Sequence, residues 1–229
     1  MVGGMRLVHR DGRAAACASR AAGWVHGHSV LSRIGLEVVG TMTREQRFDI
    51  PAGELRAGLR FRPGMARRFL RVDAEELRDR TVPLESISGA RARELRSRLD
   101  AASSAAECRC ILGEAVGDGG RPDAVQLAIE AMVQVHGEVD VDWVADQAGM
   151  SARQFRRRCR EESGLGPKHL ARVLRFRRAC EMAARGESWL RVAAEAGYFD
   201  QAHLIRDFRE FAGGSPMSVF SKTSNGLHG

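Results

Sequence analysis

The pattern that most constrains the fold of this chain occurs twice in its C-terminal half. It consists of an apolar segment of helical spacing, a glycine, a capping residue and a second helical segment, at residues 144–155 and again at 194–208. The two glycines, Gly149 and Gly197, lie 48 residues apart. Glycine suits such a turn because it adopts positive φ and lets two helices cross closely. The sequence therefore predicts two helix-turn-helix units, and two units on one chain indicate sequence-specific DNA binding.

Capping residues predict where the helices of this half begin and end. One helix begins at Asp140 or Val141 and ends at Gly149, and Ser151 caps the next, which Gly164 ends. The other expected features are an apolar stripe at Val125, Ile129, Met132 and Val133, a linker helix over Pro167–Ala184, a helix over Trp189–Ala196 capped by Ser188, and a second recognition helix capped by Asp200 that stops near Phe211.

The linker helix sets the expected distance between the two units. Eighteen residues at ~1.5 Å of rise per residue span about 27 Å. Successive turns of the major groove are ~34 Å apart, so a monomer could read two grooves on one face of the DNA.

Helical phase separates core residues from candidate DNA contacts in each recognition helix. In the first, Phe155 and Cys159 face the core, and Arg153, Arg156 and Arg157 lie on or near the opposite face. Arginine can bind guanine through two hydrogen bonds, although each of these residues could equally be a solvated side chain. The candidates for phosphate contact are Arg158, Arg160, Lys168 and Arg209.

In the second recognition helix, the expected core stripe is Leu204, Phe208 and Phe211. Gln201, His203 and Arg206 project outward; glutamine suits adenine, and arginine suits guanine or phosphate. His203 could touch a phosphate or make a packing contact. Trp189 is expected to anchor the core of the second unit.

The charge of the chain favours a polyanionic partner. The formal net charge is +7, with 20 basic and 15 acidic residues in 1–120 and 16 and 14 in 121–229. The C-terminal half is therefore nearly neutral, but five of its arginines fall within residues 153–160. Such clustering matters more for DNA binding than total charge.

The N-terminal half reads as β-structure over residues 34–62, followed by helix. Leu36 and Val38 predict one strand, and a hairpin turn is expected at residues 51–53. The second strand would bury Leu55, Ala57, Leu59 and Phe61 and turn Arg56, Arg60 and Arg62 to its other face. Ala92, Leu95 and Leu99 then repeat at helical spacing. The arginines of residues 91–98 could bind phosphate, but a solvated helix face is the favoured interpretation. Residues 113–122, rich in Gly and Asp, predict a domain boundary.

The remaining features predict neither a metal site nor catalysis. The five cysteines form no disulfide framework, and Cys108 and Cys110 are expected to be ordinary thiols near a helix. No cofactor, catalytic residue or metal ligand set is expected. No apolar run approaches a membrane span, so the chain is expected in the cytoplasm, without a membrane partner.

The C-terminal half resembles the AraC/XylS family of bacterial transcription regulators, over roughly residues 124–220. The resemblance rests on the first turn and helix at 148–155, the start of the linker helix at 164–168, the stretch at 175–179, the second turn and helix at 197–204, and residues 215–216. It implies that each recognition helix enters its own major groove. The positions it implies for DNA contact are Arg153, Arg156, Arg157, Gln201, Ala202, His203 and Arg206. Ala202 can touch only a thymine methyl. Cys159 stands where the family usually has phenylalanine, which predicts looser packing.

The N-terminal half, at residues 38–40, 58–64 and 82–85, looks like the cupin-like sensor half of some of these regulators, with several strands missing. The expected fold is α+β: a small, partial, cupin-like β-sheet domain with helices, followed by an all-α double helix-turn-helix domain. The expected divisions are a poorly ordered segment 1–30, a sensor domain 31–116, a linker 117–123, a DNA-binding domain 124–221 and a tail 222–229.

These observations favour a sequence-specific transcription regulator that is not an enzyme. Its expected partner is double-stranded operator or promoter DNA, and RNA polymerase, a small-molecule effector and a second copy of the chain are further candidates. One alternative is a ligand-sensing or protein-interaction module that has lost DNA binding. The other is a DNA-repair methyltransferase, for which the sequence lacks a Pro-Cys-His-type nucleophile.

Overall fold

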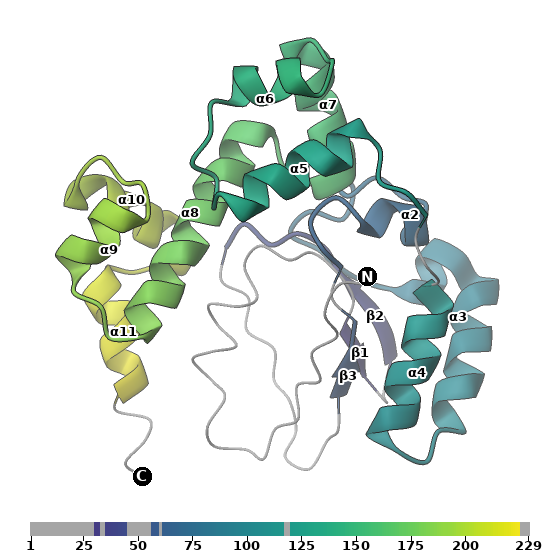
Figure 1. Ribbon diagram of the computed structural model, residues 1–229. Helices are drawn as coiled ribbons and strands as arrows, with labels where there is room; N and C mark the ends of the chain where they lie inside the picture. The colour runs from purple at the N-terminus through teal and green to yellow at the C-terminus, as the bar shows by residue number, and fades with distance from the viewer. Residues whose placement is uncertain (1–29, 33–34, 45–55, 60, 117–119, 225–229) are drawn as a thin grey trace.

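The computed structural model describes residues 30–32, 35–44, 56–59, 61–116 and 120–224 (Figure 1). Most of the segment expected to be poorly ordered, the predicted hairpin turn at 51–53 and the end of the tail lie outside these residues. The described chain is mostly helical with a small antiparallel sheet. None of the described helices is long and apolar enough to cross a membrane.

Within the part of the chain that the structure describes, the sheet of the N-terminal half has four short strands in the order β3-β1-β2-β4, and all neighbouring pairs are antiparallel. They are β1 (Val30–Ser32), β2 (Gly35–Val39), β3 (Arg56–Gly58) and β4 (Thr81–Pro83). Leu36 and Val38 of β2 are buried, as predicted. The second predicted strand was drawn too long, because β3 ends at Gly58. Leu59 and Phe61 are still buried, although they lie beyond its end.

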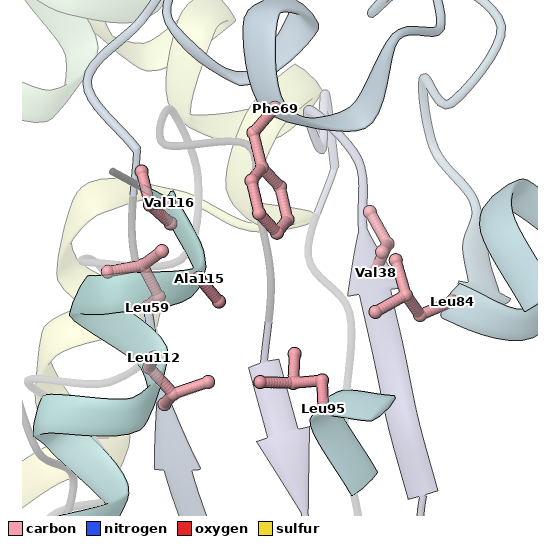
Figure 2. Close-up of a pocket in the computed structure, with 8 residues that line it drawn as sticks. All are labelled: Val38, Leu59, Phe69, Leu84, Leu95, Leu112, Ala115 and Val116. Carbon is pink, nitrogen blue, oxygen red and sulfur yellow. The ribbon is translucent and has the colours of Figure 1, made fainter. Parts of the chain in front are cut away.

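Among the described residues, three helices pack with this sheet: α2 (Ala66–Leu70), α3 (Leu84–Asp100) and α4 (Ala105–Val116). α3 and α4 contact each other, α3 contacts β2, and α4 contacts β3. Ala92 and Leu95 face the shared core as predicted, and Leu99 is half-buried against it. Side chains from both helices, α2 and the sheet region line a small apolar pocket (Figure 2): Val38, Leu59, Phe69, Leu84, Leu95, Leu112, Ala115 and Val116.

The prediction of a wholly solvated arginine face at 91–98 was wrong for Arg91. Its guanidinium lies 4.2 Å from the centre of the Phe69 ring. It also donates hydrogen bonds to the backbone oxygens of Phe69 and Ala115, at 2.9 and 3.1 Å. Arg91 therefore ties α2, α3 and α4 together, whereas Arg96 and Arg98 form surface ion pairs with Glu85 and Glu114.

The C-terminal half is all α-helical and has one continuous apolar core. Its helices match the predicted bounds closely, and the last of them, at 216–224, was not predicted. They are α5 (Ala124–Gln134), α6 (Val141–Gln147), α7 (Ala152–Ser163), α8 (Pro167–Ala184), α9 (Trp189–Glu195), α10 (Gln201–Ala212) and α11 (Pro216–Ser224). Figure 1 shows α8 running between the pair α6–α7 and the pair α9–α10.

Candidate nucleic-acid interface

The first helix-turn-helix unit is built by α6, a glycine turn and α7. Gly149 has φ of +67°, which lets the chain leave α6 and reverse toward α7. Ser151 caps α7 by a reciprocal pair of hydrogen bonds with Gln154, the capping box. Phe155 and Cys159 are fully buried beneath the helix, as their phase predicted. The opposite face of α7 is thereby fixed toward solvent.

Of the five arginines of α7, three are exposed and were predicted on that face: Arg153, Arg156 and Arg157. Arg157 has a loose ion pair, with 3.8 Å between its Nε and Glu161 Oε1. Such an exposed pair contributes little, so the guanidinium can exchange Glu161 for a phosphate or a base at small cost. Arg160 is also exposed.

Arg158 is placed differently from its neighbours. Its guanidinium lies 3.0 Å from Asp123 Oδ2, 3.1 Å from Glu161 Oε2 and 3.5 Å from Glu162 Oε1. Asp123 is the capping residue of α5, so Arg158 links α7 to the start of α5. With three carboxylates around it, Arg158 serves packing of the first unit, and a phosphate contact there remains only a prediction.

The second unit is built by α9, a glycine turn and α10. Ser188 caps α9, Gly197 has φ of +73°, and the carboxylate of Asp200 accepts a 2.6 Å hydrogen bond from the backbone N–H of His203. Leu204, Phe208 and Phe211 are buried as predicted. Trp189 is partly buried and packs edge-on against Phe208 and Phe220. It therefore anchors this unit, as expected.

The predicted contact residues of α10 fall into two groups. Gln201, Ala202 and Arg206 are exposed. His203 is half-buried, and its ring lies edge-on to Tyr198 with 5.0 Å between ring centres. The packing alternative for His203 is thus realised, and its side chain remains half exposed.

Sequence reasoning missed Phe199, which is 94% exposed in the second turn. In the first unit the capping residue follows the turn glycine by two positions, and in the second unit Asp200 follows Gly197 by three. The extra residue is Phe199. Comparing the two turns position by position would have singled it out.

The helix α8 holds the two units together and packs against α7, α9 and α10. Phe176 of α8 meets Phe208 and Phe211 of α10, with ring centres 4.8 and 5.2 Å apart. Arg172 donates to Asp207 at 2.7 Å and to Glu210 at 2.6 Å. Because both polar and apolar contacts fix α10 on α8, the two recognition helices have a defined spacing. Lys168 and Arg209 are exposed.

Two further observations concern the reactivity of Cys159 and the placement of metal-ligating side chains. Burial raises the pKa of the Cys159 thiol to about 12, which keeps it protonated and unreactive at neutral pH. Within the described ranges, no group of three or more His, Cys, Asp or Glu side chains is placed to hold a metal ion.

The comparisons with known proteins agree with this geometry. Residues 144–222 match the sequence profile of a family described as a helix-turn-helix domain. No curated protein matches the chain at a significant level. The matched residues define a DNA-binding transcription regulator. The match covers about a third of the chain, and this AraC-type domain of two units joined by α8 supports a regulator of the AraC/XylS family.

Proposed function

We propose that the chain is a sequence-specific regulator whose two recognition helices, α7 and α10, enter separate major grooves of one promoter or operator. The observation that carries the proposal is the pair of exposed polar faces at the N-terminal ends of α7 and α10, each held by a capped helix over a buried core. Recognition helices of this kind meet base edges with their N-terminal residues.

The proposed base contacts are Arg153, Arg156 and Arg157 on α7 and Gln201, Ala202, His203 and Arg206 on α10. Arg160, Lys168 and Arg209 are proposed phosphate contacts, because all three are exposed and basic. Arg158 is the weakest phosphate candidate, since three carboxylates already surround it.

For the N-terminal half, residues 31–116, we propose a partial cupin-like sensor domain, joined by residues 117–123 to the DNA-binding domain 124–221. A small-molecule effector of this domain is proposed from the family resemblance alone, because the apolar pocket in Figure 2 has a volume of about 10 Å³, room for no more than about one water. A second copy of the chain and RNA polymerase are proposed partners of the same complex, which would act in the cytoplasm without catalysis.

The test is a footprinting and affinity measurement with the full chain on the DNA upstream of its own gene, at two salt concentrations. We expect a protected region of about two major-groove turns and an affinity that falls steeply with salt. The Arg157→Ala variant should weaken binding and lower the salt slope or relax specificity within one half of the site. Arg177→Ala, on the linker helix and paired with Glu181, is the matched control.

Two outcomes separate the proposal from its alternatives. Binding no tighter than to competitor DNA at both salts would overturn it and favour a protein-interaction module that has lost DNA binding. Uniform, salt-dependent binding without a footprint would remove sequence specificity and leave only a non-specific DNA-binding protein.

A further inference from the structure

The C-terminal end of the first recognition helix receives its hydrogen bonds from the N-terminal half. The last carbonyls of a helix have no partner within the helix. In α7, the Glu161 oxygen accepts a 2.8 Å hydrogen bond from the backbone N–H of Ala74. The Ser163 oxygen accepts one of 2.7 Å from the hydroxyl of Thr41, which is buried. Two carbonyls of this helix end therefore depend on residues about 90 and 120 positions earlier in the chain.

A buried carboxylate strengthens the same joint. Only 3% of the Glu162 side chain is exposed. Its Oε1 lies 3.2 Å from Arg67 Nη1 of α2, and its Oε2 accepts a 3.1 Å hydrogen bond from Gln126 Nε2 of α5. Arg67 is held in turn by Asp73, with 2.6 Å between Nε and Oδ1. A cation beside the C-terminal end of a helix is also favoured by the helix dipole.

The helix that carries Arg67 is fixed inside the N-terminal half. Two residues after Arg67, Phe69 lines the apolar pocket and lies under the guanidinium of Arg91. α2 thus contacts α7 on one side and the core of the N-terminal half on the other. A movement of α2 in that core would therefore displace Arg67 relative to Glu162 at the C-terminal end of α7.

The joint leaves the proposed DNA face of α7 open. Arg153, Arg156 and Arg157 lie toward the other end of the helix and are exposed while the joint is formed. A contact that blocked DNA binding would have to cover these side chains. The observed contact instead holds the C-terminal end of α7, away from these three arginines.

We propose that Thr41 and Arg67 are positioning residues for DNA recognition: the N-terminal half braces the C-terminal end of α7 and so holds the first recognition helix in its binding orientation. The inference rests on the proposed function, since it concerns how one of the two DNA-reading helices is held. Without the brace, α7 would lose part of its pre-organisation, and binding would have to fix its orientation at a cost in affinity.

The test uses the full chain and the DNA site found by footprinting, with the variants Thr41→Val, Thr41→Ser and Arg67→Gln. Thr41→Val keeps the shape of the side chain and removes the donor; we expect about two- to tenfold weaker binding, the equivalent of one hydrogen bond. Thr41→Ser keeps the hydroxyl, so this variant should bind the DNA with wild-type affinity. Arg62→Gln is the matched control, because it breaks an ion pair between the same two halves, Arg62–Glu130, that does not touch α7.

Two readouts distinguish positioning from contact and from general instability. The salt slope should stay at the wild-type value, because no phosphate contact is removed, whereas Arg157→Ala is expected to lower it or to relax specificity. Protection should weaken in the half of the footprint read by α7 and persist in the half read by α10. The thermal midpoint of each variant is measured alongside.

Wild-type affinity for Thr41→Val and Arg67→Gln would overturn the brace and leave the proposed function intact. Equal loss in both halves of the footprint, in step with a lowered thermal midpoint, would also overturn it. Failure of the wild-type chain to protect any DNA would instead overturn the proposed function itself.

Discussion

Phe199 is a large apolar side chain held almost entirely in water at the entrance to the second recognition helix. Its backbone precedes Asp200, the capping residue of α10, so DNA bound at the N-terminal end of that helix would meet it. Phenylalanine can contact a thymine methyl group in the major groove. The exposed ring is thus suited to the edge of a base step.

We expect Phe199→Ala to weaken binding to the specific site several-fold, about 1 kcal/mol, with little change in the salt slope. Leu190→Ala is the control, because Leu190 is 73% exposed at the start of α9 and not at the recognition helix. The measurement is the affinity of each variant for the specific DNA site at two salt concentrations. Equal effects of the two substitutions would assign the exposed ring no part in recognition.

Cys159 gives the first unit a dependence on high pH. Its thiol pKa is raised to about 12, and burial is the largest cause. The pKa of a cysteine in an unfolded chain is about 8.5. Below the unfolded value the thiol is protonated in both states and its contribution is constant. Above it, only the unfolded chain loses the proton, so stability falls as pH rises between the two values.

At pH 10 this loss amounts to about 2 kcal/mol, since each unit of pKa difference is worth about 1.4 kcal/mol. We expect the Cys159→Ala variant, whatever its stability at pH 7, to lose less stability than wild type between pH 7 and pH 10. Urea unfolding at both pH values measures it. Parallel losses in the two proteins would show that other groups cause the dependence.

At the scale of elements, one arginine joins α8 to α10. Arg172 is the partner of Asp207, which is buried, and of Glu210. Its side chain also lies over the Phe211 ring, 5.1 Å from the ring centre. Removing Arg172 would leave a buried carboxylate without this cation, which is costlier than losing a surface pair.

We expect Arg172→Gln to lower the free energy of unfolding by about 2 kcal/mol, a value reduced because Arg172 is one-third exposed. Arg177→Gln breaks an i, i+4 pair with Glu181 within the same helix, whose carboxylate is 42% exposed rather than buried, and should cost only about 0.3–0.5 kcal/mol. Chemical denaturation of both variants gives the comparison. Similar values for the two would mean that Arg172 contributes no more than a surface charge.

The helices that the sequence predicted well are those with local signals. Ser151, Ser188 and Asp200 cap α7, α9 and α10 as expected, because a cap depends on residues within one turn. α11 was missed although its start also has local signals: Ser215 accepts a 3.2 Å hydrogen bond from the backbone N–H of Ser218, and Pro216 is the first helical residue.

The side chains that the sequence could not place have partners far away in the chain. Arg158 and Arg157 are neighbours with the same chemistry, yet Arg158 meets Asp123, 35 residues earlier, and only the fold brings the two together. Arg91 was assigned to solvent for the same reason, since Phe69 and Ala115 lie 22 and 24 residues away. Helical phase predicted which residues are buried; it does not predict ion pairs.

For the whole molecule, the linker helix fixes the distance between α7 and α10, and under the proposed function it thereby fixes the spacing of the DNA half-sites. α8 is continuous over its 18 residues and packs against both units. A flexible linker would tolerate changes in spacing, whereas a packed helix holds one distance.

Inserting about 5 base pairs between the half-sites, half a helical turn, should reduce affinity to that of a single half-site. Inserting about 10 base pairs restores the face of the DNA but adds ~34 Å, so we expect no recovery. Binding to the three DNA molecules is measured with the same full chain. Recovery at the longer spacing would show that the two units move independently.

The joint between Thr41 and Ser163 also bears on how the chain is made. The two residues are 122 positions apart, so Thr41 is synthesised long before Ser163, whose carbonyl oxygen accepts its hydrogen bond. Until α7 has emerged, the Thr41 hydroxyl lacks its acceptor, and Arg67 has Asp73 but not Glu162 as a partner. A chain whose synthesis stops short of residue 161 would therefore expose these donors to water, and the joint closes only after α7 has been made, while residues 164–229 are still to follow.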